Sequence, residues 1–338
     1  MTARRGFLLA AGFGTRLRPL TNFRPKPLTP VCGVPMLDHA AALLQQHGVH
    51  AAVVNAHHLP EQIVAWAQQH PMDLHVSVEL PAILGTGGGL KRALPQLAER
   101  FVVVNGDILS DVDLGALFEA LDDQAAAMAL RALDPDQSYG QVVADEAGVV
   151  CDLVKLATAP PQGQLRTGTH FTGVHALTRA MVEQLPDGES CIVRQAYVNE
   201  VPRRRVQSTL HEGSWFDVGT PLAYLDANLL AVEGRLALPL DPFTRAAYAR
   251  RGQQEIGVRP EAHLQGSVWI GHGARIAPGA RLGPRVVIGD RASIGQGADL
   301  QDTVVWDGAV VPAGTRLRRA IVYDGGTLTL GGPATGAG

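Results

Sequence analysis

The chain has 338 residues, enough for two domains at about 100–200 residues each. Hydrophobic residues make up 46% and charged residues 18%, a composition typical of a globular protein that buries a sizeable core. The formal net charge is −3 and the lysines and arginines are scattered, so no basic face for nucleic acid is expected. No apolar run reaches the about 18 residues of a membrane-spanning helix. Composition therefore argues against nucleic-acid and membrane partners.

Three cysteines, Cys32, Cys151 and Cys191, are far apart and show no CxxC spacing. An odd number without motif spacing is typical of reduced thiols, and not of a disulfide framework or a metal site. We therefore expect a cytoplasmic protein.

The first 130 residues alternate short apolar runs with amphipathic ones. Strands are expected at 6–11, 51–55, 74–79 and 101–105, and helices at 36–47, 60–69 and 88–97. This alternation implies parallel βαβ units, in which ligands bind at the carboxyl ends of the strands. The predicted fold class is α/β, a Rossmann-like domain with a mixed, mostly parallel sheet.

The pattern loosens between about residues 126 and 215. A hairpin is expected at 141–151, turning at Glu146–Gly148, and a strand at 170–176. We expect this section to pack over the sheet and close a cleft. A hydroxyl cap and an N1 proline, Thr220 and Pro221, then predict a helix over 222–231.

A repeat with a period of six residues follows. Its positions are Ile270, Ile276, Leu282, Ile288, Ile294, Leu300 and Trp306. Neither a helix nor a plain strand has this period, whereas a left-handed parallel β-helix places one inward side chain per short strand. The register slips after Trp306, as expected of a capping turn. The predicted order is therefore an α/β domain over 1–232, a linker over 233–259, a short left-handed β-helix over 260–330 and a disordered tail over 331–338.

A glycine-rich loop follows the first strand. Gly12 and Gly14 would let backbone amides approach phosphate oxygens, and Arg16 can bridge the charged oxygens of a triphosphate. Further on, prolines on both sides of Lys26 stiffen the backbone and fix where its ammonium points.

Other glycine-loop motifs fit this segment poorly. A dinucleotide-binding fingerprint needs a third glycine where Leu17 stands, and a Walker A loop needs a Gly-Lys-Ser/Thr sequence that is absent here. An ordinary glycine turn with basic surface residues remains as the alternative.

The loop resembles the signature of the sugar-1-phosphate nucleotidylyltransferases. Their Gly-x-Gly-Thr-Arg-Leu-x-Pro-Leu-Thr sequence, followed by Pro-Lys and Pro-Val, matches residues 12–21, 25–26 and 30–31. The resemblance covers about residues 6–231, and many members also carry a C-terminal left-handed β-helix. It implies an enzyme that joins a nucleoside triphosphate to a sugar 1-phosphate. It assigns catalysis to Arg16 and Lys26, and substrate binding to Ala11, Gly12, Gly14 and Thr15.

A carboxylate, Asp107, follows the buried strand that is expected at 101–105. Mg²⁺ held by one or two carboxylates commonly screens the charge around a phosphorus under attack. The family's Trp-x-Asp-Val-Gly-Thr-Pro motif matches residues 215–221, and its aspartate is Asp217. The resemblance thus implies a Mg²⁺ site at Asp107 and Asp217, with Asp107 also catalytic. A simple turn cap at Asp107, and a favourable helix N-terminus near Asp217, are the alternatives.

Two further segments match substrate-binding parts of the family. Gly85, Thr86 and Gly87 lie in a loop that reads the nucleobase in the family, with glycine-rich helix entry as the alternative. Lys155 stands where a family lysine grips the sugar phosphate, although Val154 replaces the usual glutamate; a solvated hairpin lysine is the alternative.

The segment of Thr172 and Gly173 occupies the place of the family's Asn-x-Gly sequence, with Phe171 instead of asparagine. The histidines, among them His57, His58 and His170, show no metal-ligand spacing, and we interpret them as structural or surface residues.

Several functions remain in competition. The base loop resembles guanylyltransferases of mannose 1-phosphate or heptose 1-phosphate and, less closely, the uridylyltransferase of N-acetylmuramate 1-phosphate. We therefore expect GTP with mannose 1-phosphate or a related sugar, with UTP and an amino-sugar 1-phosphate as the alternative. A non-catalytic nucleotide-sugar-binding regulator is a third reading, and a β-helix that transfers acyl groups is a fourth. Because only His263 and His272 lie near the start of the β-helix, homo-oligomer assembly or allostery is the role expected for it.

Overall fold

The computed structural model describes residues 5–134, 138–240, 257–258 and 262–331. The chain forms two compact units, each discontinuous in sequence. The α/β unit combines Met1–Phe13 with Ala40–Trp215, and the solenoid unit combines Gly14–His39 with Phe216–Gly338. The solenoid unit thus includes the segment 14–39 and, before residue 232, the segment that begins at Phe216. The predicted linker and tail fall largely outside the described residues, and the predicted domain bounds stay predictions.

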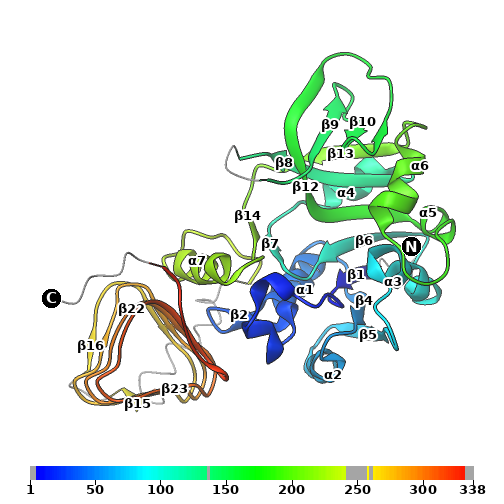
Figure 1. The fold of residues 1–338 in the computed structure, drawn as a ribbon. Helices are drawn as coiled ribbons and strands as arrows, with labels where there is room; N and C mark the ends of the chain where they lie inside the picture. The colour runs from blue at the N-terminus through cyan, green and yellow to red at the C-terminus, as the bar shows by residue number, and fades with distance from the viewer. Residues whose placement is uncertain (1–4, 135–137, 241–256, 259–261, 332–338) are drawn as a thin grey trace. The chain divides into compact units, whose positions relative to one another are not determined.

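The α/β unit is built on one ten-stranded sheet, in which β11-β10-β9-β12-β6-β1-β4-β5 are neighbours and β8 joins β12 to β13 (Figure 1). Its strands are β1 (Arg5–Leu9), β4 (Ala51–Ala56), β5 (Asp73–Val78), β6 (Arg100–Asn105), β8 (Ala126–Ala132), β9 (Gln141–Asp145), β10 (Val150–Leu153), β11 (Ala157–Thr158), β12 (Leu165–Thr178) and β13 (Val206–Leu210). A short strand, β7 (Ile108–Ser110), follows β6. The helices are α1 (Met36–Gln46), which begins in the solenoid unit, α2 (Pro60–Gln69), α3 (Gly85–Ala93), α4 (Leu114–Leu121), α5 (Arg179–Glu183) and α6 (Val198–Glu200), which follows a π-helical turn at Val193–Tyr197.

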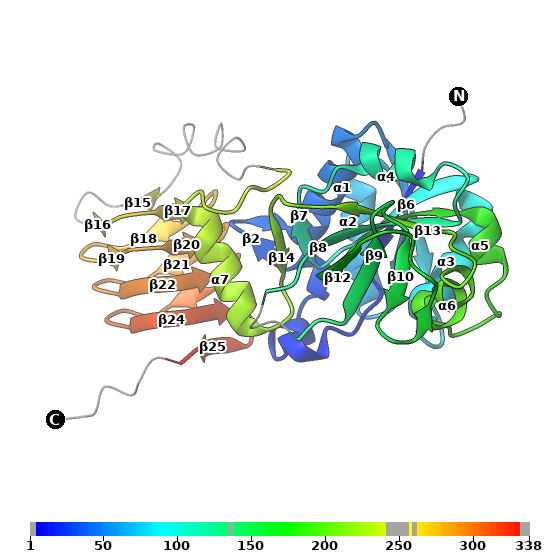
Figure 2. The same cartoon turned by 90° about the horizontal axis from the view of Figure 1, so that it is seen from above.

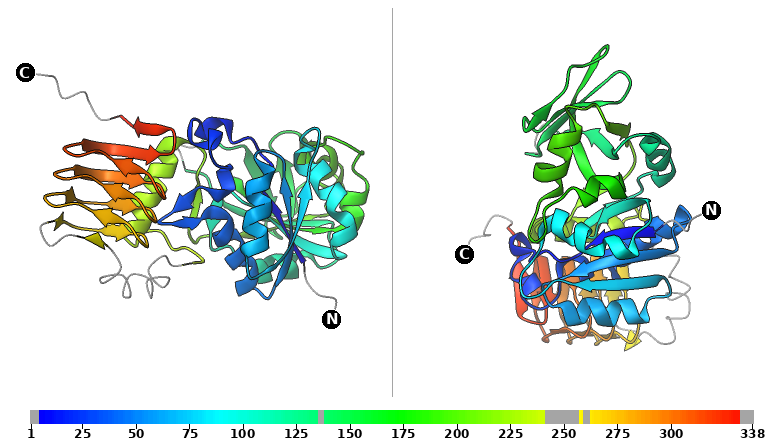
Figure 3. Two further views of the ribbon diagram at one scale, coloured as in Figure 1. Left: turned by 90° about the horizontal axis from the view of Figure 1, so that it is seen from below. Right: turned by 90° about the vertical axis from the view of Figure 1, so that its right-hand side faces the viewer.

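The four strands expected in the first part of the chain form the parallel half of this sheet. β1 pairs in parallel with both β4 and β6, and β4 pairs in parallel with β5 (Figure 3). The predicted α/β class with a mixed, mostly parallel sheet is confirmed. The middle section differs from its prediction, because β12 pairs antiparallel with β6 and brings the middle strands into the same sheet. It extends the sheet, and does not simply pack over it.

Two element bounds differ from their predictions for local reasons. α3 begins at Gly85 and ends at Ala93, after which Pro95 lacks the amide that would continue the helix and a 3₁₀ turn forms at Leu94–Gln96. The strand expected at 170–176 is the middle of a much longer strand, β12. β12 bulges between Phe171 and His175 on its pairing with β8, so one strand can serve several neighbours.

The core of the α/β unit lies where the apolar faces of its strands and helices meet. Phe7, Phe101 and Val103 come from the parallel strands and Leu90 from α3, and all four are fully buried. Alternate residues of a strand face opposite sides, so each parallel strand supplies both layers of the core.

The solenoid unit contains three rows of short parallel strands. They are β15 (Gly257–Val258), β18 (Arg275–Ile276), β21 (Ser293–Ile294) and β23 (Val310–Val311); β16 (His263–Leu264), β19 (Arg281–Leu282) and the start of β22 (Asp299–Val305); and β17 (Val268–Ile270), β20 (Val286–Ile288) and the end of β22, with β24 (Arg316–Tyr323) and the antiparallel β25 (Gly326–Thr329) closing the stack. The stacked coils are seen from the side in Figure 2.

The predicted hexad positions stack on one another through the coil. Ile270 pairs with Ile288, Ile276 with Ile294, and Leu282 with Leu300, each one coil apart. The repeat therefore produces a three-sided parallel coil with aliphatic side chains inside, as expected. The left-handed sense of the coil stays a prediction.

Trp306 does not occupy the interior row that its hexad position predicted. The partner of Ile288 in the next coil is Val305, because this coil is one residue shorter. The missing residue falls near Asp302, whose φ of 49° marks a tight left-handed turn. The register slip thus comes before Trp306, and that side chain is buried one position beyond the interior row.

The remaining elements of the solenoid unit come from distant parts of the sequence. α7 (Pro221–Val232) starts as predicted, with the Thr220 hydroxyl accepting from the amide of Ala223 at 3.2 Å. It packs against β20, β22 and β24. The two-residue strands β2 (Pro30–Val31) and β3 (Val34–Pro35) form a tight hairpin, and β14 (Trp215–Asp217) precedes α7.

Candidate active site

In the α/β unit, predicted site residues gather where β1 and β6 end. Leu9 lies beside Asn105 in the sheet, and the amide of Gly106 donates to the carbonyl of Leu9 at 2.9 Å. Ala11 and Gly12 follow β1, and Asp107 stands half-buried in the turn after Gly106. Because parallel strands end at the same edge, Asp107 and the start of the glycine loop share one edge of the sheet.

Gly12 occupies an exposed and open position. A Cβ added there would meet no atom within 4 Å, and its φ is not in the left-handed region. Neither packing nor backbone conformation in the described residues therefore requires glycine at this position. The backbone at Gly12 is thus accessible to a ligand, and substrate binding there stays a prediction.

A buried chain of hydrogen bonds that we did not predict supports this edge of the sheet. Asn55 Oδ1 accepts from the amide of Ala10 at 2.7 Å, and Asn55 Nδ2 donates to Glu79 Oε1 at 2.8 Å. The other oxygen of Glu79 accepts from the amide of Leu84 at 2.7 Å, and Glu79 is fully buried. These hydrogen bonds connect the start of the phosphate loop to the residue before the glycine-rich first turn of α3. Asn55 and Glu79 each end a predicted strand, which is the signal that could have identified them.

The glycines of the predicted base loop have partners within the protein. The amide of Gly87 donates to the carbonyl of Ser190 at 2.8 Å, and the Thr86 hydroxyl accepts from the amide of Ile192 at 3.1 Å. A Cβ on Gly85 would lie 2.6 Å from the Ser190 carbonyl oxygen. These glycines thus admit the segment around Ser190 to the entry of α3. Base reading by Gly85, Thr86 and Gly87 stays a prediction.

The predicted sugar-binding residues lie in two different settings. Lys155 is exposed in the tight turn between β10 and β11, where its amide donates to Asp152 Oδ1 at 2.8 Å. Thr172 is buried, and its hydroxyl donates to the carbonyl of Ala129 at 2.9 Å. Its carbonyl accepts from the indole nitrogen of Trp215 at 2.8 Å. Thr172 therefore has a structural task in the β12 bulge, whereas Lys155 is open to a ligand.

Gly173 makes room for the residue that precedes the Gly106–Asp107 turn. Its φ is 86°, and a Cβ there would lie 2.6 Å from Asn105 Nδ2. Asn105 ends β6, so the β12 bulge packs directly beside the strand that presents Asp107. A substituent at Gly173 would press on that strand.

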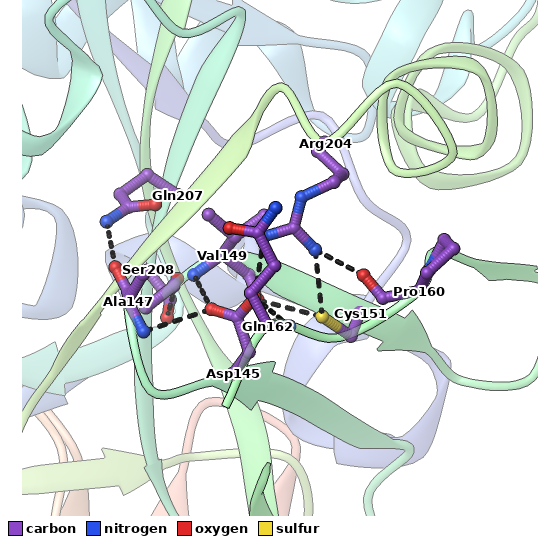
Figure 4. A network of polar contacts seen from close by, with 10 residues as sticks. Asp145, Ala147, Val149, Cys151, Pro160, Gln162, Arg204, Gln207 and Ser208 are labelled. Carbon is purple, nitrogen blue, oxygen red and sulfur yellow. Dashed lines mark hydrogen bonds and ion pairs between the residues drawn. The ribbon is translucent and has the colours of Figure 1, made fainter. Parts of the chain in front are cut away.

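The hairpin that leads to Lys155 is anchored by a buried ion pair (Figure 4). Asp145 Oδ2 lies 2.6 Å from Arg204 and accepts from the amide of Gln162 at 3.0 Å. Its Oδ1 accepts from the amides of Ala147 and Val149 at 3.1 and 3.0 Å. Burial alone would raise the pKa of Asp145, but the hydrogen bonds from Arg204 and the backbone outweigh it and leave that pKa below its usual value.

The solenoid unit carries a second group of predicted site residues around one carboxylate. Lys26 Nζ lies 3.7 Å from Asp217 Oδ1, and an Arg16 guanidinium nitrogen lies 4.0 Å from Asp217 Oδ2. The side chains of Lys26 and Asp217 are 8% and 12% exposed, whereas that of Arg16 is 68% exposed. The structure thus brings together three residues that the sequence indicated for the site, Arg16, Lys26 and Asp217. One long cation is free to reach outward and one is held in place.

The backbone around Lys26 is fixed at several points. The Thr29 hydroxyl donates to the Lys26 carbonyl at 2.8 Å, and a 3₁₀ turn spans Lys26–Leu28. Gly14 has a φ of 60°, and a Cβ there would lie 3.0 Å from the Lys26 Cβ. Gly14 therefore allows the loop with the exposed Thr15 to close over Lys26.

The predicted metal ligands, Asp107 and Asp217, lie in different units. Carboxylate oxygens are the ligand class that Mg²⁺ prefers, so both residues suit that ion by ligand type, although Asp217 is also paired with Arg16 and Lys26. Across the parts of the chain that the structure describes, no group of three or more His, Cys, Asp or Glu side chains forms a metal cluster of its own. The Mg²⁺ site predicted at Asp107 and Asp217 stays a prediction. Among the same residues, no helix is long and apolar enough to cross a membrane.

Comparison with known proteins defines the class of protein. Residues 5–233 match the family described as Nucleotidyl transferase, and residues 264–329 match the family described as GMPPB C-terminal domain. The chain therefore belongs to the nucleotidyl transferase family of enzymes, as the phosphate loop predicted.

Similar proteins of known activity indicate which nucleotidyl transferases this chain resembles. The chain is 30% identical over 286 residues to a mannose-1-phosphate guanylyltransferase of Mycobacterium tuberculosis, covering 80% of this chain and 76% of the relative. It is also 30% identical over 235 residues to an N-acetylmuramate alpha-1-phosphate uridylyltransferase of Neisseria meningitidis, covering 67% and 98%. The predicted resemblance to sugar-1-phosphate nucleotidylyltransferases is thus confirmed.

Solved structures support the fold. HddC from Yersinia pseudotuberculosis matches with a TM-score of 0.55 and 22% sequence identity, covering 67% of this chain and 98% of that one. A putative glucose-1-phosphate thymidylyltransferase from Bacillus anthracis matches with a TM-score of 0.56 and 21% identity, covering 68% and 95%. Both likenesses show the fold of the nucleotidyltransferase part.

Proposed function

We propose that the protein transfers a nucleotidyl group from a nucleoside triphosphate to a sugar 1-phosphate, with pyrophosphate as the second product. The observation that carries this proposal is the group formed by the buried Lys26 ammonium and the exposed Arg16 around Asp217. It lies at the end of a glycine loop that starts at the open Gly12. Positive charge held within a glycine-rich loop suits phosphate, and the family supplies the reaction class.

The chemistry needs positioning and charge neutralisation more than proton transfer. An oxygen of the sugar 1-phosphate attacks the α-phosphorus, and the bond from that phosphorus to the bridging oxygen breaks as pyrophosphate leaves with the electron pair. The attacking oxygen is already an anion, so no general base is needed. Lys26 would stabilise the charge on the α-phosphate and Arg16 would hold the leaving pyrophosphate. Lys155 would hold the phosphate of the sugar.

Asp107 and Asp217 would hold Mg²⁺, which when bound screens the negative oxygens around the phosphorus. Mg²⁺ is the expected ion because both ligands are hard carboxylates. Substrate contacts at Ala11, Gly12, Gly14, Thr15, Gly85, Thr86, Gly87, Thr172 and Gly173 are proposed from the family resemblance. Thr172 would act through its backbone, because its hydroxyl bonds to Ala129.

GTP and mannose 1-phosphate, or a related sugar, are the substrates we propose. The mycobacterial relative and the match of residues 264–329 favour them, because both extend into the solenoid. UTP with N-acetylmuramate 1-phosphate is the alternative, favoured by the neisserial relative, which this chain covers almost completely. A regulatory protein that only binds nucleotide sugars is the third reading, and the presence of Arg16, Lys26, Asp107 and Asp217 disfavours it.

The test is a matrix of four nucleoside triphosphates against a panel of sugar 1-phosphates, with millimolar Mg²⁺ and pyrophosphate release as the readout. We expect release with GTP and mannose 1-phosphate. Release with UTP and N-acetylmuramate 1-phosphate alone would favour the alternative pair. No release with any pair would contradict catalysis and favour the regulatory reading.

Location and assembly complete the proposal. Free thiols at Cys32, Cys151 and Cys191 suit a reducing compartment, and we propose the cytoplasm. Nucleic-acid and membrane partners are not expected, and homo-oligomers would form through the solenoid. Incubation with acetyl-CoA and an amino sugar tests the acyl-transfer alternative, for which release of a thiol is the positive result.

A further inference from the structure

Trp306 is the largest fully buried side chain of the described chain, and it does not face the interior of the coil. The register shift near Asp302 puts Val305 in the interior row and Trp306 one position further on. Its indole nitrogen donates to the Tyr224 hydroxyl on α7 at 2.9 Å. The Arg24 guanidinium lies over its ring, 4.7 Å from the ring centre. Trp306 therefore joins the coil to two segments that come from elsewhere in the sequence.

Both of these segments lead directly to the charged groups of the candidate site. The Tyr224 hydroxyl donates in turn to the carbonyl of Pro30 at 2.6 Å. Burial raises the pKa of Tyr224, so its hydroxyl stays protonated and keeps this bond. Arg24 and Pro30 stand on either side of Lys26 in the sequence. Arg24 contacts the Trp306 ring and Pro30 accepts from Tyr224; we call Trp306, Tyr224 and Arg24 the Trp306 cluster.

The second segment begins at the carboxylate itself. Asp217 ends β14, three residues before the Thr220 cap of α7, and Tyr224 completes the first turn of that helix. Arg24 is further fixed by an ion pair to Asp307, the residue after Trp306, at 3.5 Å. Phe23 contacts Tyr323 of β24 edge-to-face, with ring centres 5.6 Å apart. The segment that carries Lys26 and the helix that follows Asp217 thus both contact the indole ring of Trp306.

We propose that Trp306 is a positioning residue for nucleotidyl transfer, which sets the separation of Lys26 and Asp217 through Tyr224 and the segment from Arg24 to Pro30. The solenoid is then part of the active-site support, in addition to any role in assembly. This inference rests on the proposed function. A small misplacement of a catalytic group is enough to cost about tenfold or more in rate.

The test compares three single variants, and the double variant of the first two, with the parent enzyme. Trp306→Phe keeps an aromatic ring under Arg24 but removes the indole donor, and Tyr224→Phe removes the hydroxyl at the centre of the chain of hydrogen bonds. Ile294→Ala is the matched control, because it opens a cavity inside the coil without touching the cluster. All are assayed below their unfolding temperatures, with pyrophosphate release at saturating substrates.

We expect kcat to fall about tenfold in Trp306→Phe and in Tyr224→Phe, with KM changed about twofold or less. The double variant should lose little more than either single variant, because both interrupt one path. Labelling of Lys26 by an amine reagent, followed by peptide mass spectrometry, should accelerate in both variants. Ile294→Ala should lose thermal stability but keep kcat and the labelling rate.

Two results would overturn the inference while leaving the proposed function intact. One is a kcat within twofold of the parent in both cluster variants. The other is an equal loss of kcat in Ile294→Ala, which would mean that solenoid stability and not the cluster controls the rate. A parent enzyme that releases no pyrophosphate would instead remove the proposed function itself.

Discussion

Asp145 and Asp217 both pair with arginine or lysine side chains, and the geometries of these two carboxylates differ sharply. Asp145 lies 2.6 Å from Arg204 and accepts three backbone amides as well (Figure 4). Asp217 meets its two cations at 3.7 and 4.0 Å, and one of these, Arg16, is largely exposed. The same residue types therefore form a closed structural anchor in one unit and a wider charged group in the other.

The difference shows how a structural ion pair can be told from a binding site. Short bonds from several donors within the protein stabilise a buried carboxylate and leave little room for a ligand. Longer ion pairs with an exposed cation can rearrange around phosphate oxygens at small cost. The sequence motifs indicated Asp217 and Arg16, whereas no sequence pattern indicated that Asp145 and Arg204 would pair.

The largest expected effect tests the charged group around Asp217. Asp217→Asn should lower kcat by about 100- to 1000-fold, because it removes a charge that the transfer requires. Its unfolding temperature should stay close to that of the parent. Asp107→Ala should likewise abolish turnover with the fold intact. Pyrophosphate release and thermal unfolding measured on the same samples check both, and near-normal activity in either variant would remove that residue from the site.

The second effect tests the buried ion pair between Asp145 and Arg204. Asp145→Asn should lower the free energy of unfolding by about 3 kcal/mol, because it leaves Arg204 half-buried without its charged partner. Activity per folded molecule should change little. Gln207→Ala is the control in the same network, because Gln207 donates only to the Ala147 carbonyl at the surface and should cost about 0.5 kcal/mol or less. Chemical denaturation measures both, and equal losses would show that the anchor has no special weight.

A smaller effect separates the two kinds of glycine in the phosphate loop. Gly12→Ala should lower kcat/KM about tenfold with no loss of stability, because the added Cβ would meet no protein atom within 4 Å and would obstruct a substrate bound against the backbone. Gly14→Ala should lose activity and also about 1 kcal/mol of stability, because its φ is 60° and its Cβ would press on Thr21. An unchanged kcat/KM in Gly12→Ala would argue against close approach of substrate at Gly12.

The smallest effect concerns pH. The pKa of Asp145 is lowered in the folded protein, so the stability from this group is full above the usual carboxyl pKa of about 4 and is lost as the pH falls through the lowered value. The difference in unfolding free energy between the parent and Asp145→Asn should therefore shrink below about pH 4. Denaturation curves between pH 3 and 7 measure it. A difference that stays constant over this range would mean that the charge of Asp145 contributes nothing.

Much of the fold could be predicted because it depends on local periodicity. The strand ending at Asn105, the helix opening at Pro221 and the stacked isoleucines of the coil all follow from patterns that repeat along the chain. The phosphate loop could be recognised for a related reason, since its glycines and flanking prolines act through their own backbone. The loop and the Trp-x-Asp motif thus indicated Arg16, Lys26 and Asp217 as site residues, and the structure places both cations within 4.0 Å of Asp217.

Other parts could not be predicted because they depend on partners that are distant in the sequence. Nothing local indicates that Ser190 fills the space left by Gly85 and Gly87, or that the Thr172 hydroxyl bonds inside the bulge of β12. The seventh hexad position is similar. A shortening of the coil by a single residue decides whether Trp306 points into the coil or toward Tyr224.

The sequence by itself determined the α/β class, the coil and the family, because periodicity, turn residues and a phosphate loop act within short stretches of chain. Only the tertiary structure decided which glycines are open and which are required by packing, and which carboxylate is bonded on several sides within the protein. It also decided that the segment carrying Lys26 belongs to the solenoid unit. Those outcomes depend on which surfaces meet after folding, and no short window of the sequence contains both surfaces.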